Sequence, residues 1–79
     1  MSRVILVYSE FNTQYARLVQ QSAIVFVNKK AAQDFMRQMY DSINEDLQFL
    51  THGIFGNTSA ELNSARTHET FYWRILPAL

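Results

Sequence analysis

Three segments of this 79-residue chain have the pattern of β-strands that are apolar on both faces. They span residues 3–11, 23–27 and 69–76. In the first segment one face carries Val4, Leu6 and Tyr8, and the opposite face carries Ile5, Val7 and Phe11. A strand with water on one side alternates apolar and polar residues, whereas a strand covered on both sides is apolar throughout. The pattern therefore predicts a small sheet with both faces covered.

One long amphipathic helix is predicted after the second strand. Asn28 is a good N-cap residue, and the pairs Lys30–Asp34 and Arg37–Asp41 place opposite charges one helical turn apart. The apolar positions recur at spacings of three and four residues: Ala32, Phe35, Met36, Met39, Ile43, Leu47 and Leu50. One helix covers one face of a sheet, so the second face needs another cover.

Residues 14–22 fit two structures. Tyr15, Leu18 and Val19 have helical spacing, whereas Tyr15, Arg17 and Val19 alternate as in a strand. A strand that pairs back on the first one is favoured, because consecutive strands joined by a short turn usually pair.

The second half of the chain is predicted to contain a loop and a short helix before the last strand. Gly53 is a natural helix stop, and residues 52–59 read as a loop. Thr58 and Glu61 form a capping box for a short helix up to about Arg66, and Pro77 ends the last strand. The predicted fold is thus α+β, a single domain over residues 1–79. It has a small antiparallel sheet of about three strands on one long amphipathic helix, in the order β-β-α-(short α)-β.

The composition indicates more apolar surface than one small domain hides. Hydrophobic residues make up 48% of the chain and aromatic residues 14%, which excludes a disordered segment. A domain of this size buries only about 60% of its unfolded surface. Six Phe, four Tyr and one Trp exceed what such an interior easily holds, and a dimer or a bound partner would cover the surplus.

Composition also limits the compartment and the chemistry. The chain has no cysteine, which excludes disulfides and thiolate metal sites. The N-terminal apolar run over residues 4–8 is too short for a signal peptide. No stretch approaches the roughly 20 apolar residues that cross a bilayer. We therefore expect a cytoplasmic protein that does not enter a membrane.

The pattern predicts no enzyme, and it predicts no catalytic, cofactor-binding or metal-binding residues. His52 and His68 are the only histidines, and neither stands at a spacing typical of metal ligands. Asp41 and Glu45 share a helix face, where exposed carboxylates are normally solvated. We consider three hypotheses for the function. The weakest is an enzyme built at a dimer interface around His52 or His68.

A single-stranded nucleic-acid-binding protein is the second hypothesis. It would use Tyr72, Trp73 and Arg74 on a sheet face, together with Arg3 and Arg17. The formal net charge of zero argues against it, because nucleic-acid affinity comes mainly from phosphate neutralisation. Residues 53–56 form a GxxG without the basic residues of a KH-type nucleic-acid clamp.

The leading hypothesis is a small non-enzymatic protein-binding module that associates with itself, as a homodimer. It would act stoichiometrically as an inhibitor or accessory regulator of another protein. Small cysteine-free domains of this type include regulators encoded by phages and mobile elements. The expected partner anchors are Tyr8, Tyr72, Trp73 and Arg74, because aromatic residues and Arg dominate interface hot spots.

Overall fold

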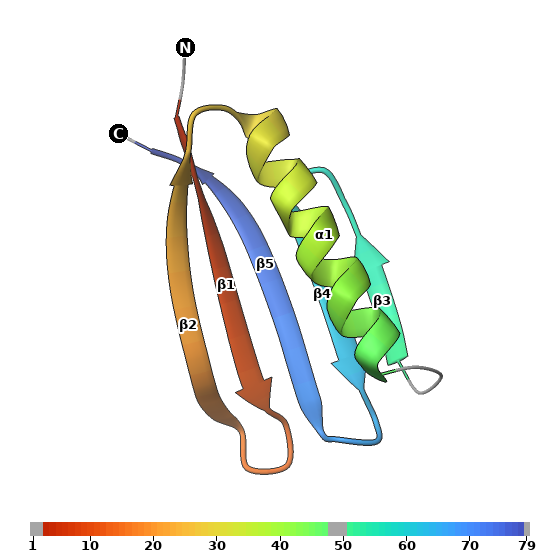
Figure 1. Cartoon of the computed structure of the whole chain (residues 1–79). Coiled ribbons are helices and arrows are strands. Elements are labelled where there is room, and N and C mark those ends of the chain that lie inside the picture. The colour runs from red at the N-terminus through yellow and green to blue at the C-terminus, as the bar shows by residue number, and fades with distance from the viewer. Residues whose placement is uncertain (1–2, 48–50, 79) are drawn as a thin grey trace.

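The computed structural model describes residues 3–47 and 51–78, and these form a five-stranded antiparallel sheet with one helix on one of its faces (Figure 1). In chain order the elements are β1 (Val4–Asn12), β2 (Arg17–Phe26), α1 (Lys29–Leu47), β3 (Thr51–Phe55), β4 (Ser59–Ser64) and β5 (Glu69–Pro77). The strands lie in the order β2-β1-β5-β4-β3, so α1 connects one edge strand to the other. The last strand in the sequence therefore occupies the middle of the sheet.

The prediction of about three strands and a short second helix is wrong. Residues 52–59, predicted as a loop, contain most of β3, and the predicted helix is replaced by β4 and a turn. Ala60, Leu62 and Ser64 are buried while the residues between them are half-buried. Burial of every second residue against a sheet outweighs a local capping signal, because helix propensity is a weak preference that tertiary contacts override.

The first hairpin resolves the ambiguity over residues 14–22 in favour of a strand from Arg17 onwards. Residues 13–16 form the turn. There the Asn12 Oδ1 atom accepts hydrogen bonds from the backbone N–H groups of Gln14 (3.0 Å) and Tyr15 (3.2 Å). This is an Asx turn, in which a side chain takes the place of a backbone acceptor. Ala16 closes the turn with a positive φ of 51°.

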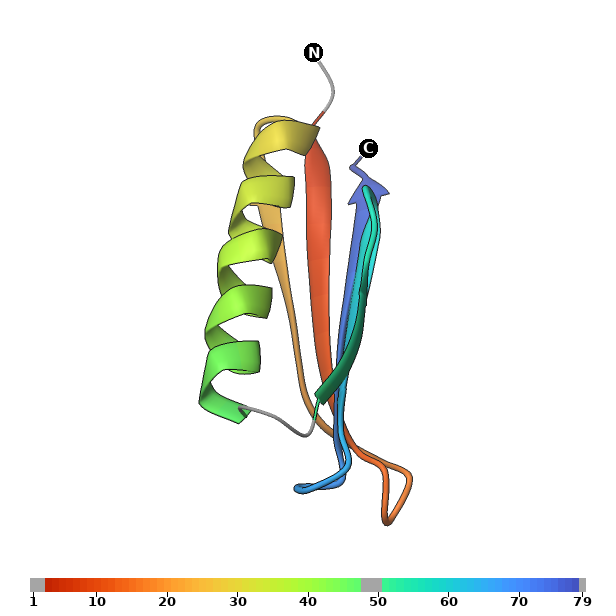
Figure 2. The same ribbon diagram turned by 90° about the vertical axis from the view of Figure 1, so that its right-hand side faces the viewer.

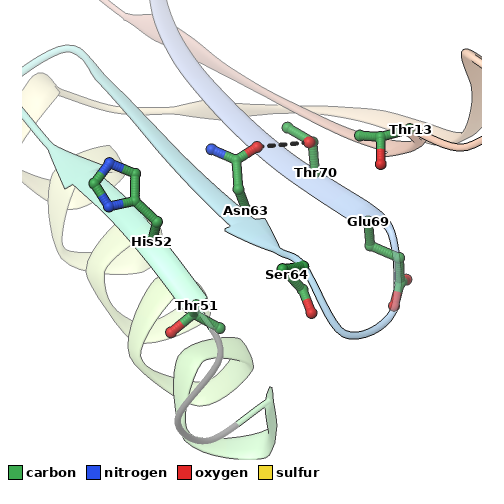
Figure 3. Close-up of a pocket in the computed structure, with 8 residues that line it drawn as sticks. Thr13, Thr51, His52, Asn63, Ser64, Glu69 and Thr70 are labelled. Atoms are coloured by element: carbon green, nitrogen blue, oxygen red, sulfur yellow. Dashed lines mark hydrogen bonds between the residues drawn. The ribbon is translucent and has the colours of Figure 1, made fainter.

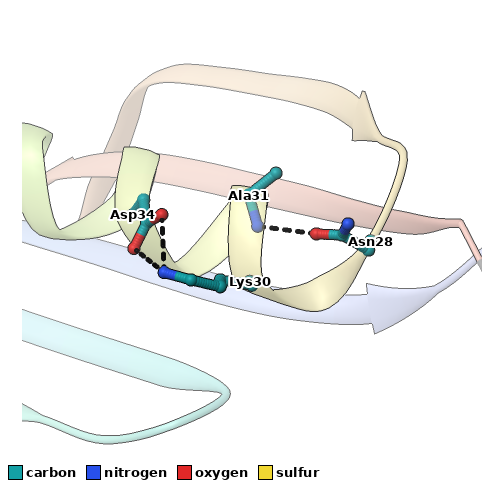
Figure 4. Close-up of polar contacts among 4 residues, drawn as sticks. All are labelled: Asn28, Lys30, Ala31 and Asp34. Atoms are coloured by element: carbon teal, nitrogen blue, oxygen red, sulfur yellow. Dashed lines mark hydrogen bonds and ion pairs between the residues drawn. The ribbon is translucent and has the colours of Figure 1, made fainter.

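The helix begins where the sequence predicts. The Asn28 Oδ1 atom accepts the backbone N–H of Ala31 at 2.8 Å, which confirms the N-cap (Figure 4). Lys30 and Asp34 form an ion pair at 3.2 Å. Arg37 and Asp41 form the second pair, also at 3.2 Å. Both pairs are largely exposed, so each contributes little to stability.

The predicted C-terminal end of the helix is not confirmed. The predicted apolar position Leu50 lies outside the described residues. Gly53, predicted to end the helix, lies inside β3, and the described helix ends at Leu47.

The core lies between α1 and one face of the sheet. Its fully buried large side chains are Leu6, Met36, Leu62 and Trp73. The strand register places Leu6 beside Ile75 and Tyr8 beside Trp73, with Ala60 on the other side of Trp73. Strands β1, β5 and β4 thus form the floor of the core, and Trp73 lies near its centre.

Gly53 makes room for an aromatic side chain that descends from the helix. A Cβ atom at this position would overlap the Tyr40 hydroxyl group. The Tyr40 ring packs edge-on against Phe55, with ring centroids 5.1 Å apart, and lies 5.8 Å from the Trp73 ring. The Arg37 guanidinium lies 4.6 Å from the centre of the Phe55 ring. A glycine within a strand is typical of such close approaches.

Two backbone hydrogen bonds close the sheet at its opposite ends. The Ala78 N–H donates to the Arg3 carbonyl at 3.1 Å, where the described chain begins and ends. At the other end, the Thr13 N–H donates to the His68 carbonyl at 2.7 Å. The second bond joins the β1–β2 and β4–β5 turns, so the two hairpins are held together beyond the strands themselves.

Replacing Ala16 by Gly is expected to stabilise the protein. An L-residue in the left-handed region costs about 1–2 kcal/mol, and Gly avoids this cost. Gly loses more backbone entropy on folding than Ala does, which offsets roughly 0.5–1 kcal/mol of that gain. We therefore expect the free energy of unfolding to rise by about 0.5–1 kcal/mol for Ala16→Gly, measured by chemical denaturation. Ala65→Gly, in the other hairpin turn but without a positive φ, should lower it slightly. Equal effects of the two substitutions would contradict this account of the turn.

Replacing Gly53 by Ala is expected to destabilise the protein by about 1–3 kcal/mol, because Tyr40 must leave its place against Phe55 and Trp73. Gly56→Ala is the matched control, since its Cβ would meet only the Ser59 carbonyl oxygen, at 3.3 Å. Denaturation curves and the near-ultraviolet circular dichroism of the aromatic cluster measure both variants. A Gly53→Ala protein as stable as Gly56→Ala would show that the space over β3 is not required.

Candidate functional site

The face of the sheet opposite α1 is uncovered among the described residues (Figure 2). Residues paired across antiparallel strands lie on the same face, so Ile5, Val25 and Leu76 form one row of it. We call this surface the open face, and its side chains come from Ile5, Val7, Ser9, Phe11, Leu18, Gln21, Ala23, Val25, His52, Ile54, Ser59, Glu61, Asn63, Thr70, Tyr72, Arg74 and Leu76.

The open face has an apolar half and a polar half. Over β2, β1 and the end of β5, the row of Ile5, Val25 and Leu76 is purely aliphatic. Over β4 the open-face residues are Ser59, Glu61 and Asn63, and all three are polar. Tyr72 and Arg74 on β5 stand between the two halves. A large apolar area bordered by polar groups is typical of an interaction surface.

The four predicted partner anchors divide between the two faces of the sheet. Trp73 and Tyr8 are 0% and 7% exposed and lie in the core under α1. Tyr72 is half-buried and Arg74 is exposed, and both lie on the open face. In this structure only Tyr72 and Arg74 can therefore be reached from outside.

Tyr8 is a buried phenol with an acidic neighbour. Its ring lies 5.3 Å from that of Trp73, and its hydroxyl donates to the Glu10 Oε1 atom at 3.2 Å. Burial raises the pKa of Tyr8 well above its usual range, and the negative charges of Glu10 and Glu69 raise it further. The hydroxyl is therefore held as a neutral donor within the fold.

The residues assigned to nucleic-acid binding are not gathered on one surface. Trp73 is enclosed in the core, which leaves the half-buried Tyr72 as the only accessible ring of the proposed stacking pair. Arg17 begins β2 at the end beside the first hairpin turn, whereas Arg3 precedes β1 at the opposite end. The Gly53–Gly56 segment lies in β3 and the following turn, not between two helices.

A polar hollow of about 450 Å³ lies beside the β4–β5 turn (Figure 3). Thr70 Oγ1 donates to Asn63 Oδ1 at 2.6 Å within it, and Asn63 Nδ2 donates to Glu61 Oε2 at 3.0 Å. The lining residues are Thr13, Thr51, His52, Asn63, Ser64, Ala65, Glu69 and Thr70. The Asn63 amide is therefore bonded through both its oxygen and its nitrogen.

The two histidines are not brought together at this hollow. His52 lines it, whereas His68 is exposed in the β4–β5 turn with a φ of 56°. Within residues 3–47 and 51–78, no three His, Asp or Glu side chains are grouped closely enough to hold a metal ion. The absence of an enzymatic activity stays a prediction.

Sequence reasoning missed the edge strand β2 as a functional element. The sequence predicts a strand over residues 23–27 and favours one over residues 14–22, but it does not show that these form a single ten-residue strand at the edge of the sheet. The available signal was the absence of charge from Leu18 to Val27. It also missed a hollow of about 390 Å³ on the flank of α1, lined by Phe35, Gln38, Met39, Ser42 and Ile43.

Comparisons of the chain with protein-family models, with curated proteins and with solved structures find no significant match. In the part of the chain that the structure describes, no helix is long and apolar enough to cross a membrane. The site must therefore be interpreted from its own geometry.

The raised pKa of Tyr8 predicts a loss of stability in alkaline solution. Above about pH 10.0, the usual pKa of the group, the unfolded chain releases this proton while the folded chain keeps it. The unfolded state gains from the release, so the free energy of unfolding falls by up to about 1.4 kcal/mol per pH unit from this group. Tyr8→Phe should flatten the fall between about pH 10 and 12, measured by denaturation at each pH. An unchanged slope in Tyr8→Phe would refute the assignment.

Proposed function

We propose that this chain is a small non-enzymatic protein-binding module that self-associates and holds another protein against its open face. It would act stoichiometrically, as an inhibitor or accessory regulator. The observation that supports the proposal best is the apolar half of the open face, where Ile5, Val7 and Leu76 remain half-buried with no described element over them.

The layering of the fold supports a macromolecular partner. A sheet that is apolar on both faces is stable when each face is packed on another layer. Here α1 supplies one layer and the chain described supplies no second one. The molecule measures 41 × 23 × 15 Å, so its broad faces are large enough for the roughly 800 Å² that each partner buries in a standard interface.

The chemistry of the open face fits a protein better than a small molecule. The hollows along the open face are open depressions rather than enclosed cavities: one of about 190 Å³ lies beside Tyr72, one of about 420 Å³ beside Phe11 and one of about 450 Å³ beside Asn63. Drug-sized ligands need concave sites of about 300–1,000 Å³ that enclose most of their surface. Tyr72 and Arg74 are residue types that carry much of the energy in protein interfaces, and they stand beside the apolar half.

Of the residues assigned to nucleic-acid binding, Tyr72 and Arg74 lie together on the open face and still support that hypothesis. Fluorescence anisotropy with a single-stranded oligonucleotide at low salt tests it. Binding that weakens steeply with salt and is lost in Arg74→Gln would favour this function over protein binding. No binding at low salt would remove it.

The double substitution Tyr72→Ala/Arg74→Ala is expected to abolish partner binding without unfolding the protein. Each hot-spot residue contributes about 2 kcal/mol or more, so the affinity should fall at least about a hundredfold. The matched control is Tyr15→Ala/Arg66→Ala, which removes the same side chains from the two hairpin turns.

The measurement has two parts. Immobilised wild type, double variant and control are compared for the proteins that each retains from a lysate, and the retained complex is then purified and its stoichiometry measured. A single protein bound at a fixed ratio by wild type and control, and lost from the double variant, is the expected outcome. An identical set retained by all three proteins would overturn the proposal, provided that circular dichroism shows each to be folded.

A further inference from the structure

The two edges of the sheet differ in what they offer to another strand. At one edge, β3 has five residues, including Gly53 and His52, and is followed directly by a turn. At the other edge, β2 has ten residues, all of which except Val19 pair with β1, and no described strand lies on its other side. An edge strand presents a row of unpaired backbone N–H and C=O groups, so β2 offers the longer template.

β2 has few of the features that normally prevent edge pairing, and those it has, the charge of Arg17 and a bulge, lie at one end. Natural edge strands are protected by charged residues, by proline, by β-bulges or by short length. Residues 18–27 contain no charged residue, no proline and no glycine. Leu18, Val19 and Val25 are 47%, 50% and 58% exposed, and Ile24 is 41% exposed on the opposite face. The only irregularity is the bulge opposite Glu10 and Phe11, near one end of the strand.

The polarity of β2 is suited to an antiparallel copy of itself. A polar centre, Gln20 to Ser22, lies between the apolar pair Leu18–Val19 and the apolar segment from Ala23 to Phe26. When such a strand meets its own copy in antiparallel orientation, polar centre faces polar centre and each apolar end faces the other apolar end. A second copy of the chain necessarily carries this pattern of polar and apolar residues, whereas a strand of another protein would match it only by chance.

Side chains above the sheet would join the same contact. The Phe35 ring lies 5.4 Å from Phe26, so this flank of α1 faces the β2 side of the molecule. The hollow of about 390 Å³ on that flank is open and is lined mainly by Phe35, Met39 and Ile43. In a pair of molecules joined at β2, the two flanks face the joined strands from the same side of the sheet.

We infer that β2 pairs with β2 of a second copy across a two-fold axis, which gives one continuous sheet of two subunits. This rests on the self-association in the proposed function and assigns its surface. Each subunit contributes the same strand, as a two-fold interface requires. The open face then continues across the boundary and remains free for the foreign partner.

The first test compares one substitution at the two edges. Ile24→Lys places a charge on the edge strand β2, on the helix side and away from the open face. Ile54→Lys makes the same substitution in the other edge strand, β3, where the side chain lies on the open face. Light scattering and sedimentation equilibrium should give twice the 9.2 kDa monomer mass for wild type and Ile54→Lys. Ile24→Lys should be monomeric at the same concentration, with its dissociation constant raised at least about tenfold. A monomeric wild type, or a dimer that survives Ile24→Lys, overturns the inference.

A second test does not depend on a destabilising substitution. Because the chain has no cysteine, Gln20→Cys, Gln21→Cys and Ser22→Cys each provide a single crosslinking site. Near a two-fold axis between paired strands, Cα atoms lie within the roughly 4.4–6.8 Å that a disulfide spans. At least one of these variants should form a disulfide dimer rapidly on mild oxidation, and His52→Cys at the β3 edge should not. Equal crosslinking at both edges, or none at β2, contradicts the inference.

The two proposals can fail separately. The mass and crosslinking measurements use the purified protein alone, whereas the test of the open face uses Tyr72 and Arg74 and a foreign protein. A monomer that still captures a partner through Tyr72 and Arg74 would refute pairing at β2 and leave the protein-binding function standing. A β2-linked dimer that captures nothing would have the opposite meaning.

Discussion

The insertion of β5 between β1 and β4 is the constraint on which the rest of the structure depends. The hairpin of β1 and β2 and the hairpin of β3 and β4 touch no common strand except β5. β5 also brings Trp73 to the centre of the core, where it meets Tyr8 from β1 and Tyr40 from α1. The sheet is therefore incomplete until the C-terminal strand has paired with the N-terminal one. Such distant pairings are expected to make folding slow for a domain of this size.

The same constraint accounts for what each face of the sheet does. Trp73, Phe71 and Ile75 point toward α1, so Tyr72, Arg74 and Leu76 must point away from it. The core and the candidate interaction surface are thus the two sides of one strand. Any change that shifted the register of β5 by one residue would exchange them, and would expose Trp73 while burying Arg74.

The regular elements with strong patterns were predictable, and those with weak patterns were not. Asn28 and the helical spacing located α1, and the apolar runs located β1 and β5. β4 was missed because its inward side chains are small or only moderately apolar, as in Ala60 and Ser64, and because Thr58 and Glu61 imitate a helix start. β3 was missed because Gly53 has low strand propensity. Its glycine is required by the Tyr40 ring, which is a tertiary contact that no local pattern reveals.

The candidate site was predictable in kind but not in detail. The apolar runs showed that both faces of each strand were hydrophobic, and the single helix showed that one face would lack a cover. They did not show which alternate set of β5 side chains would face the helix. The assignment of Trp73 as an anchor therefore rested on its residue type, while its side chain lies at the centre of the core. The length of β2 could not be predicted because residues 14–22 fit either a strand or a short helix. The Asx turn at residues 13–16, which allows the strand to begin at Arg17, is seen only in the structure.

The hydrogen bond between Ala78 and Arg3 shows that the two ends of the described chain lie next to each other. Because the ends of the described chain lie side by side, a short peptide could join them without disturbing β1 or β5. New ends could then be opened at the exposed turn around Asn57, between β3 and β4. In that permuted chain β5 and β1 would be neighbours in sequence, and the pairing that now closes the longest loop would become a local hairpin. For the same reason the domain could be placed inside a surface loop of another protein, entering and leaving at one point.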